Sequence, residues 1–123
     1  MEFKSYVEKR LQIRSEYVYA RLMEYMLEEH IYSSKSDREW TILKLEEIRN
    51  LNDRYYARIR DTSCSRLRAI TADLFNKNLI DRNIMGSDMG DIRFDIKSVS
   101  DFVSFWENKK LELNLMRKGK IVK

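Results

Sequence analysis

Arginine and tyrosine side chains alternate over a short stretch near the middle of the chain, and they offer its clearest surface chemistry. Guanidinium groups bind phosphate oxygens and tyrosine rings stack on bases, so such a cluster suits nucleic acid. The same residue types are also enriched in protein–protein interfaces. We interpret the cluster as a partner interface and keep nucleic acid as the alternative. Its members are Arg54, Tyr55, Tyr56, Arg58, Arg60 and Arg66.

A second group of charged residues ends the chain, whose formal net charge is +4. From residue 109 onward, six basic side chains stand against a single acidic one, Glu112. Such a run favours DNA or RNA because phosphate contacts release counterions. A basic terminal hairpin is also a common way to keep a sheet edge from aggregating, and both interpretations stay open. The six candidates for nucleic-acid binding are Lys109, Lys110, Arg117, Lys118, Lys120 and Lys123.

No residue pattern in the sequence indicates catalysis. His30 and Cys64 are the only residues of their types, which argues against a Cys/His metal site within one chain. We interpret His30 as a favourable charge near a helix C-terminus and Cys64 as a small buried side chain. The aspartates in the loop around Asp88 do not match a calcium-binding pattern, and no phosphate-binding glycine motif is present. We therefore expect a non-enzymatic protein that uses no metal or cofactor.

The composition indicates a small, mostly helical domain. The 123 residues are 43% hydrophobic and 36% charged, with no proline and three glycines, so long uninterrupted helices are expected. A single cysteine allows no intrachain disulfide and suggests a reducing compartment. The sequence shows no apolar run long enough to span a membrane and no signal-peptide pattern. We expect a soluble, cytoplasmic protein that does not engage a membrane.

Hydrophobic spacing predicts two long helices in the first two thirds of the chain. The first covers residues 2–32, and its face with Arg10, Arg14 and Arg21 is interpreted as solvated. The second organises the chain over residues 36–74, where Ser36 and Glu39 form a capping box and a helix begins at Asp37. Residues 61–65 are poor helix formers but contain no glycine or proline. A continuous or kinked helix is favoured there, and a restart that gives two helices nearly end to end stays open. A short turn between the two helices predicts a long antiparallel hairpin.

The pattern changes after the glycine-bearing residues 86–91. Ile92, Phe94 and Ile96 alternate with polar residues, as in a half-buried strand. Ser98 and Asp101 then mark a helix start. Residues 111–115 alternate again and predict a second strand, followed by a turn at residues 117–120 and a final short strand.

These elements give a mainly α fold class, with a long antiparallel helical hairpin or bundle followed by a small C-terminal α+β module. The predicted domains are residues 1–85 (helical), 86–91 (linker) and 92–123 (the small module with its basic tail).

This layout resembles the GINS subunits of the archaeal and eukaryotic replicative helicase. The resemblance rests on residues 47–59 and 66–70, which are similar to the last helix of the family's helical domain, and on residues 115–121, which are similar to the close of its small domain. The chain lacks the proline that usually precedes that last element. The resemblance implies a non-enzymatic scaffold whose helices pack in a ring-like tetramer and whose small module contacts the helicase or its partner.

Two hypotheses follow for the function. The first is a helical assembly subunit, homo- or hetero-oligomeric through its helices, with a GINS-like role in DNA replication. The alternative is a small nucleic-acid-binding transcriptional regulator of winged-helix-like type. In that alternative, the last helix of the helical part and the basic C-terminal hairpin would contact the duplex.

Overall fold

The fold is rich in helix and contains one small sheet, which confirms the predicted fold class at that level. The computed structural model describes residues 3–32, 40–83 and 91–121, with side chains described for 14–32, 40–83 and 91–114. In chain order the elements are α1 (Phe3–Tyr32), β1 (Thr41–Lys44), α2 (Leu45–Arg49), the 3-10 helix η1 (Arg54–Tyr56), α3 (Ala57–Arg60), α4 (Cys64–Asn76), β2 (Ile80–Asn83), β3 (Asp91–Ile96) and α5 (Val99–Ile121).

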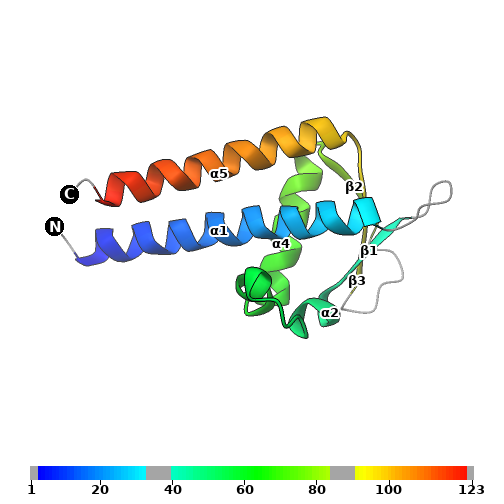
Figure 1. Ribbon diagram of the computed structural model, residues 1–123, viewed down its shortest axis with the longest axis horizontal. Helices are drawn as coiled ribbons and strands as arrows, with labels where there is room; N and C mark the ends of the chain where they lie inside the picture. The colour runs from blue at the N-terminus through cyan, green and yellow to red at the C-terminus, as the bar shows by residue number, and fades with distance from the viewer. Residues whose placement is uncertain (1–2, 33–39, 84–90, 122–123) are drawn as a thin grey trace.

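The longest helices, α1 and α5, lie side by side and run in opposite directions, so both ends of the chain lie at the same end of the molecule (Figure 1). Helix α4 crosses this pair steeply, and the sheet lies at the end away from the termini (Figure 1). The three strands are antiparallel in the order β1-β3-β2. The long antiparallel pair is therefore made by the first and last helices of the chain.

The prediction of one long helix over residues 36–74 is wrong. Its described part contains β1, α2, η1, α3 and most of α4. Thr41 and Leu43 are buried and alternate with exposed Ile42 and Lys44, the pattern of a strand with one covered face. The apolar residues on either side of the β1–α2 junction are spaced three or four apart, as on one face of a helix, and this spacing led to the helix prediction. The capping box of Ser36 and Glu39 lies outside the described residues.

At residues 61–65 the favoured continuation or kink is wrong and the alternative of a restart is correct, because α4 begins anew at Cys64. The Ser63 hydroxyl accepts a hydrogen bond from the Arg66 amide at 3.2 Å and caps the new helix. The Thr62 hydroxyl donates to the Arg58 carbonyl at 2.6 Å and occupies the end of α3. Side-chain hydrogen bonds, rather than glycine or proline, separate the two helices.

The end of α4 leads directly into β2, a strand that was not predicted within the helical domain of residues 1–85. Asn78 adopts the left-handed conformation at φ 61°, and the Leu79 amide donates to the Leu74 carbonyl at 3.1 Å. This is a standard helix termination in which asparagine takes the place usually filled by glycine. The chain then leaves as β2, which pairs with β3 from Ile80 opposite Ile96.

In the C-terminal third, the predicted strand at residues 92–96 is confirmed as β3, and the Ser98 hydroxyl accepts from the Asp101 amide at 3.2 Å at the start of α5. The predicted strand at residues 111–115 and the turn at 117–120 are wrong, because α5 runs through both. Leu111 is 58% exposed and Leu113 is 7% exposed. Two leucines two residues apart thus lie on different helix faces, whereas a strand would have placed them on one face.

One hydrophobic core holds these elements together. It includes Leu22 and Met26 of α1, Leu74 of α4, Phe94 of β3 and Phe102 of α5, all fully buried. Strand β1, from the predicted helical domain, pairs with β3, from the predicted module. The described parts of both predicted domains therefore share one sheet and one core.

Candidate nucleic-acid interface

An open groove of 680 Å³ runs between α1 and the segment from η1 to the first turn of α4. Most of its polar lining is cationic or aromatic, and its remaining lining includes Asp61 and Thr62. We call it the arginine groove, and its defining residues are Arg14, Tyr17, Arg54, Tyr55, Arg58 and Arg66.

Short capped elements bring these arginines together. The Asp53 carboxylate accepts from the Tyr55 amide at 2.9 Å and fixes the start of η1, from which Arg54 projects. Arg58 follows in α3, and the Ser63 cap places Arg66 in the first turn of α4. Three elements within thirteen residues, η1, α3 and α4, thus line the groove opposite α1.

The wall of the groove is formed by arginine and tyrosine side chains that contact one another. The guanidinium carbon of Arg58 lies 4.6 Å from the ring centroid of Tyr17. That of Arg21 lies 4.8 Å from Tyr17 and 3.6 Å from Tyr55. At these distances the cation is attracted to the ring face, so each side chain restricts the next.

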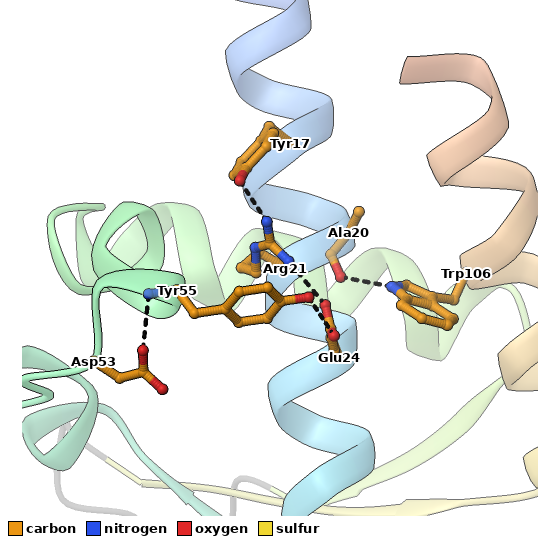
Figure 2. Close-up of polar contacts among 7 residues, drawn as sticks. All are labelled: Tyr17, Ala20, Arg21, Glu24, Asp53, Tyr55 and Trp106. Carbon is orange, nitrogen blue, oxygen red and sulfur yellow. Dashed lines mark hydrogen bonds and ion pairs between the residues drawn. The ribbon is translucent and has the colours of Figure 1, made fainter. Parts of the chain in front are cut away.

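Glu24 joins two of these side chains, Arg21 and Tyr55, by polar contacts. Figure 2 shows Tyr17, Arg21 and Glu24 along α1, with Tyr55 reaching them from η1. The Tyr55 hydroxyl donates to Glu24 at 2.5 Å, Arg21 is ion-paired with Glu24 at 3.0 Å, and Arg21 also donates to the Tyr17 hydroxyl. Burial and the hydrogen bond to Glu24 raise the pKa of Tyr55 to about 12, so this residue stays a hydrogen-bond donor near neutral pH.

The groove carries a net positive charge. Asp61 is the one carboxylate among its described lining residues. The Arg60 side chain is ion-paired with Asp61 at 3.0 Å and holds the pKa of Asp61 below its usual value. Because Arg60 offsets Asp61, the four lining arginines act on whatever occupies the groove.

Helix α4 presents a narrow outer face beside the groove. Its buried face is formed by Leu67, Ile70, Thr71 and Leu74, and the residues opposite are small or polar and exposed. Those residues are Ser65, Ala69 and Asn76. Arg66 flanks this outer face on the groove side.

Arg68 flanks the outer face of α4 on the other side. It acts electrostatically on Arg82 of β2, whose pKa is lowered by burial and by the positive charge of Arg68. The Nε atom of Arg82 is buried and has no hydrogen-bond partner among the residues that the structure describes. This flank of α4 is therefore positively charged as well.

Four of the six residues predicted as a partner interface come together in the arginine groove, namely Arg54, Tyr55, Arg58 and Arg66. Tyr56 does not, because it is only 6% exposed and packs edge-on against Tyr25 in the core at 5.2 Å. Arg60 turns away to Asp61 and to the Leu51 carbonyl.

Sequence reasoning missed the α1 side of the groove. Arg14 was assigned to a solvated face and Tyr17 was not singled out, yet both line the groove. Their i,i+3 spacing put them on one face, but only the tertiary structure shows which arginines they meet. Arg68 and Arg82 were missed for the same reason, since they come from a helix and a strand whose boundary was not predicted.

The predicted basic tail is helical rather than a hairpin. Lys109 is ion-paired with Glu16 of α1 at 2.9 Å, and the Lys110 ammonium lies 4.2 Å from the Trp106 ring. The backbone of Arg117, Lys118 and Lys120 continues α5, and Lys123 lies outside the described residues. The two lysines with described side chains thus engage α1 and α5, and neither lines the arginine groove.

The single cysteine and histidine have structural contacts. The Cys64 thiol is half-buried and accepts from Arg49 at 3.0 Å, and His30 lies 3.8 Å from Asp95. Within the described ranges, no group of three or more histidine, cysteine, aspartate or glutamate residues could hold a metal ion. None of the described helices is long and apolar enough to cross a membrane.

The site is therefore a positively charged groove beside a helix with a narrow outer face, and its chemistry is that of anion recognition. Comparison with protein-family models, with curated proteins and with solved structures gave no match to this chain.

Proposed function

We propose that the protein binds double-stranded DNA as a winged-helix-type regulator, with α4 in the major groove. One observation carries the proposal: the first half of α4, before the exposed Phe75, exposes small side chains between arginines on both flanks. Bulky residues would hold the helix away from base edges, whereas Ser65 and Ala69 permit a close approach. The B-DNA major groove is about 12 Å wide and admits one α-helix, while that of A-form RNA is too narrow.

The order of elements supports the same proposal by analogy. Helical segments α2 to α3 precede α4, with a tight turn at residues 61–63 between α3 and α4. The antiparallel strands β2 and β3 follow, and β1 completes the sheet. This is the sequence of parts in a winged helix-turn-helix, whose second helix enters the major groove. The hairpin of the proposal is β2–β3 and not the C-terminal tail.

The arginine groove supplies contacts to the DNA backbone in this proposal. Arg66 lies both on the flank of α4 and in the groove, so a phosphate strand beside an inserted α4 passes along Arg54 and Arg58. Arginine binds phosphate with two parallel hydrogen bonds, which fixes the strand as well as attracting it. On the opposite flank, Arg68 and Arg82 are placed to meet the other strand.

A charge on the outer face of α4 tests the proposal. Ala69 is exposed, so Ala69→Glu leaves folding intact but puts a carboxylate against the DNA. Binding to a mixed-sequence duplex is expected to weaken at least tenfold, because non-specific affinity is mainly electrostatic. Ser104→Glu, which adds the same charge on an exposed position of α5, is the matched control and is expected to bind as the wild type does.

The result is measured by fluorescence anisotropy over about 50–200 mM salt, where the wild-type affinity is expected to fall steeply. Equal weakening in both variants would trace the effect to net charge rather than to α4. Binding that is absent at low salt, or equally tight to duplex RNA, would contradict the proposal.

We also keep assembly through the long helices as a second candidate, favoured by Leu111, which is 58% exposed on α5. An oligomer would cover such leucines. The GINS-like role stays a prediction, and residues 47–59, on which the resemblance partly rests, are divided among α2, η1 and α3. A monomer by light scattering at every concentration would count against assembly.

A further inference from the structure

A second hollow, of 200 Å³, lies between α1 and α5. Figure 2 shows Trp106 of α5 approaching α1 at Ala20, while Tyr55 of the arginine groove approaches it on another side. We call this hollow the α1–α5 pocket. Its lining comes from one face of each helix, namely Tyr17, Ala20, Arg21, Glu24, Trp106, Lys110, Leu113 and Asn114.

The pocket combines an apolar wall with a few polar groups. Trp106 and Leu113 form the wall on α5, and the Trp106 indole N–H donates to the Ala20 carbonyl at 3.1 Å. This hydrogen bond fixes the indole against α1. The Lys110 ammonium lies 4.2 Å from the same ring. Apolar walls with a few placed polar groups are the usual construction of small-molecule sites.

The charges of the pocket favour an anion. It is lined by two cations, Arg21 and Lys110, and by one carboxylate, Glu24. Glu24 is already engaged, because it pairs with Arg21 and accepts from Tyr55. The Nε atom of Arg21 is buried and lacks a hydrogen-bond partner within the described part of the chain. A buried donor of this kind is unfavourable until an acceptor reaches it.

We propose that the α1–α5 pocket binds a small organic anion, a monocarboxylate carrying an apolar ring. The carboxylate lies between Arg21 and Lys110, and the ring packs on Trp106 and Leu113. The volume of 200 Å³ has room for roughly 13–20 water-sized groups at roughly 10–15 Å³ each, which is enough for a carboxylate that carries one small ring.

The occupied pocket also acts on the arginine groove, a step that rests on the proposed function. Arg21 lies 3.6 Å from the ring centroid of Tyr55, and Tyr17 lines both hollows. A carboxylate that draws Arg21 toward the pocket loosens Tyr55 in the groove wall. It also places negative charge beside the groove. Both effects lower the affinity for DNA, and by linkage DNA lowers the affinity for the anion.

Benzoate is the probe, and the fluorescence of Trp106 in a Trp40→Phe background is the readout, with no DNA present. Saturable binding with a dissociation constant on the order of 1 mM is expected for a ligand of about nine non-hydrogen atoms. Neutral benzamide is expected to bind at least tenfold more weakly. Lys110→Gln is expected to weaken benzoate at least tenfold, since it removes a charge-assisted contact.

Lys44→Gln is the matched control, because Lys44 is exposed on β1 and pairs with Glu47 at 3.7 Å. It is expected to leave benzoate binding unchanged. The site is overturned if benzoate gives no saturable change, if benzamide binds as tightly, or if both lysine variants behave alike.

The experiment without DNA is the first arm of the test. The second arm measures duplex affinity with benzoate at saturation. A fall of about fivefold, the lower end of usual coupling between sites, is expected and should vanish in Lys110→Gln. Unchanged duplex affinity with benzoate bound would overturn the coupling and leave the pocket standing. If the protein binds no duplex, the proposed function and the coupling both fail, while the first arm still decides the pocket.

Discussion

The arginine groove and the α1–α5 pocket lie on two sides of the same helix and share Tyr17, yet their chemistry differs. The groove, of 680 Å³, is open and carries four arginines, and its carboxylate is already offset by Arg60. The pocket, of 200 Å³, has one indole, one leucine and two cations. Helix α1 supplies polar and aromatic residues to both. What faces α1 decides the difference: capped short helices bring arginines that suit a polyanion, whereas α5 brings Trp106 and Leu113, which suit a small ligand.

The largest expected effect is on duplex affinity when charge is removed from the arginine groove and the α1–α5 pocket is left unaltered. In the triple variant Arg14→Gln, Arg58→Gln, Arg66→Gln, the slope of log K against log salt should become shallower by about 3, because each neutralised phosphate accounts for roughly 0.9 of the slope. Duplex affinity near 0.15 M salt should fall about 100-fold on the same basis. Benzoate binding should change far less than duplex affinity, because none of the three residues lines the pocket.

The control for this triple variant removes the same charge elsewhere. Lys44, Lys77 and Lys97 are exposed and ion-paired with Glu47, Asp73 and Asp81 respectively. Their replacement by glutamine should change duplex affinity far less. If affinity falls equally in both triple variants, net charge explains the binding and the groove has no special part in it.

Tyr55→Phe tests the wall that separates the two sites, with a smaller expected effect. It removes the hydrogen bond to Glu24, and the free energy of unfolding should fall by about 1 kcal/mol. Urea unfolding near neutral pH measures this. Since Arg21 keeps its own ion pair with Glu24 in this variant, benzoate should still bind. An unchanged stability would mean that the Tyr55–Glu24 hydrogen bond does not hold η1 on α1.

The same variant should alter the response to alkali. The pKa of Tyr55 is raised to about 12 from an ordinary value of 10.0, so the folded state holds the phenol proton more tightly than the unfolded state does. That contribution to stability is complete below pH 10 and is lost as the pH rises toward 12. Tyr55→Phe should therefore lose less stability than the wild type over this range. A residual decrease is expected, because burial raises the pKa of Tyr25 to about 12 as well.

Local patterns allowed part of the fold to be predicted. Helix α1, strand β3 and the Ser98 cap each follow from periodicity or from hydrogen bonds within a few residues. Strand β1 could not be recognised in the same way. Only its pairing with β3, some fifty residues away, distinguishes its buried Thr41 and Leu43 from a helical stripe.

The site was predictable in part for the same reason. The arginine–tyrosine cluster was visible because its members are neighbours in sequence. The sequence could not show that Tyr56 is buried and Tyr55 exposed, because two adjacent tyrosines carry no local signal of which one faces the core. The α1–α5 pocket joins residues about ninety positions apart, and the predicted strand at 111–115 removed the helix that forms one wall.

The smallest expected effect concerns Lys109 of α5, which was predicted to bind nucleic acid but is ion-paired with Glu16 of α1. The two side chains are 17% and 22% exposed, and their charged atoms lie 2.9 Å apart. Lys109→Gln should lower the free energy of unfolding by about 0.5 kcal/mol, and salt should change this effect little because partly buried ion pairs are weakly screened. Duplex affinity should stay within about twofold, since a lysine held by Glu16 makes no phosphate contact. A salt slope that becomes shallower by about one unit would instead assign Lys109 to the DNA interface, and the contrast between the two sides of α1 would fail there.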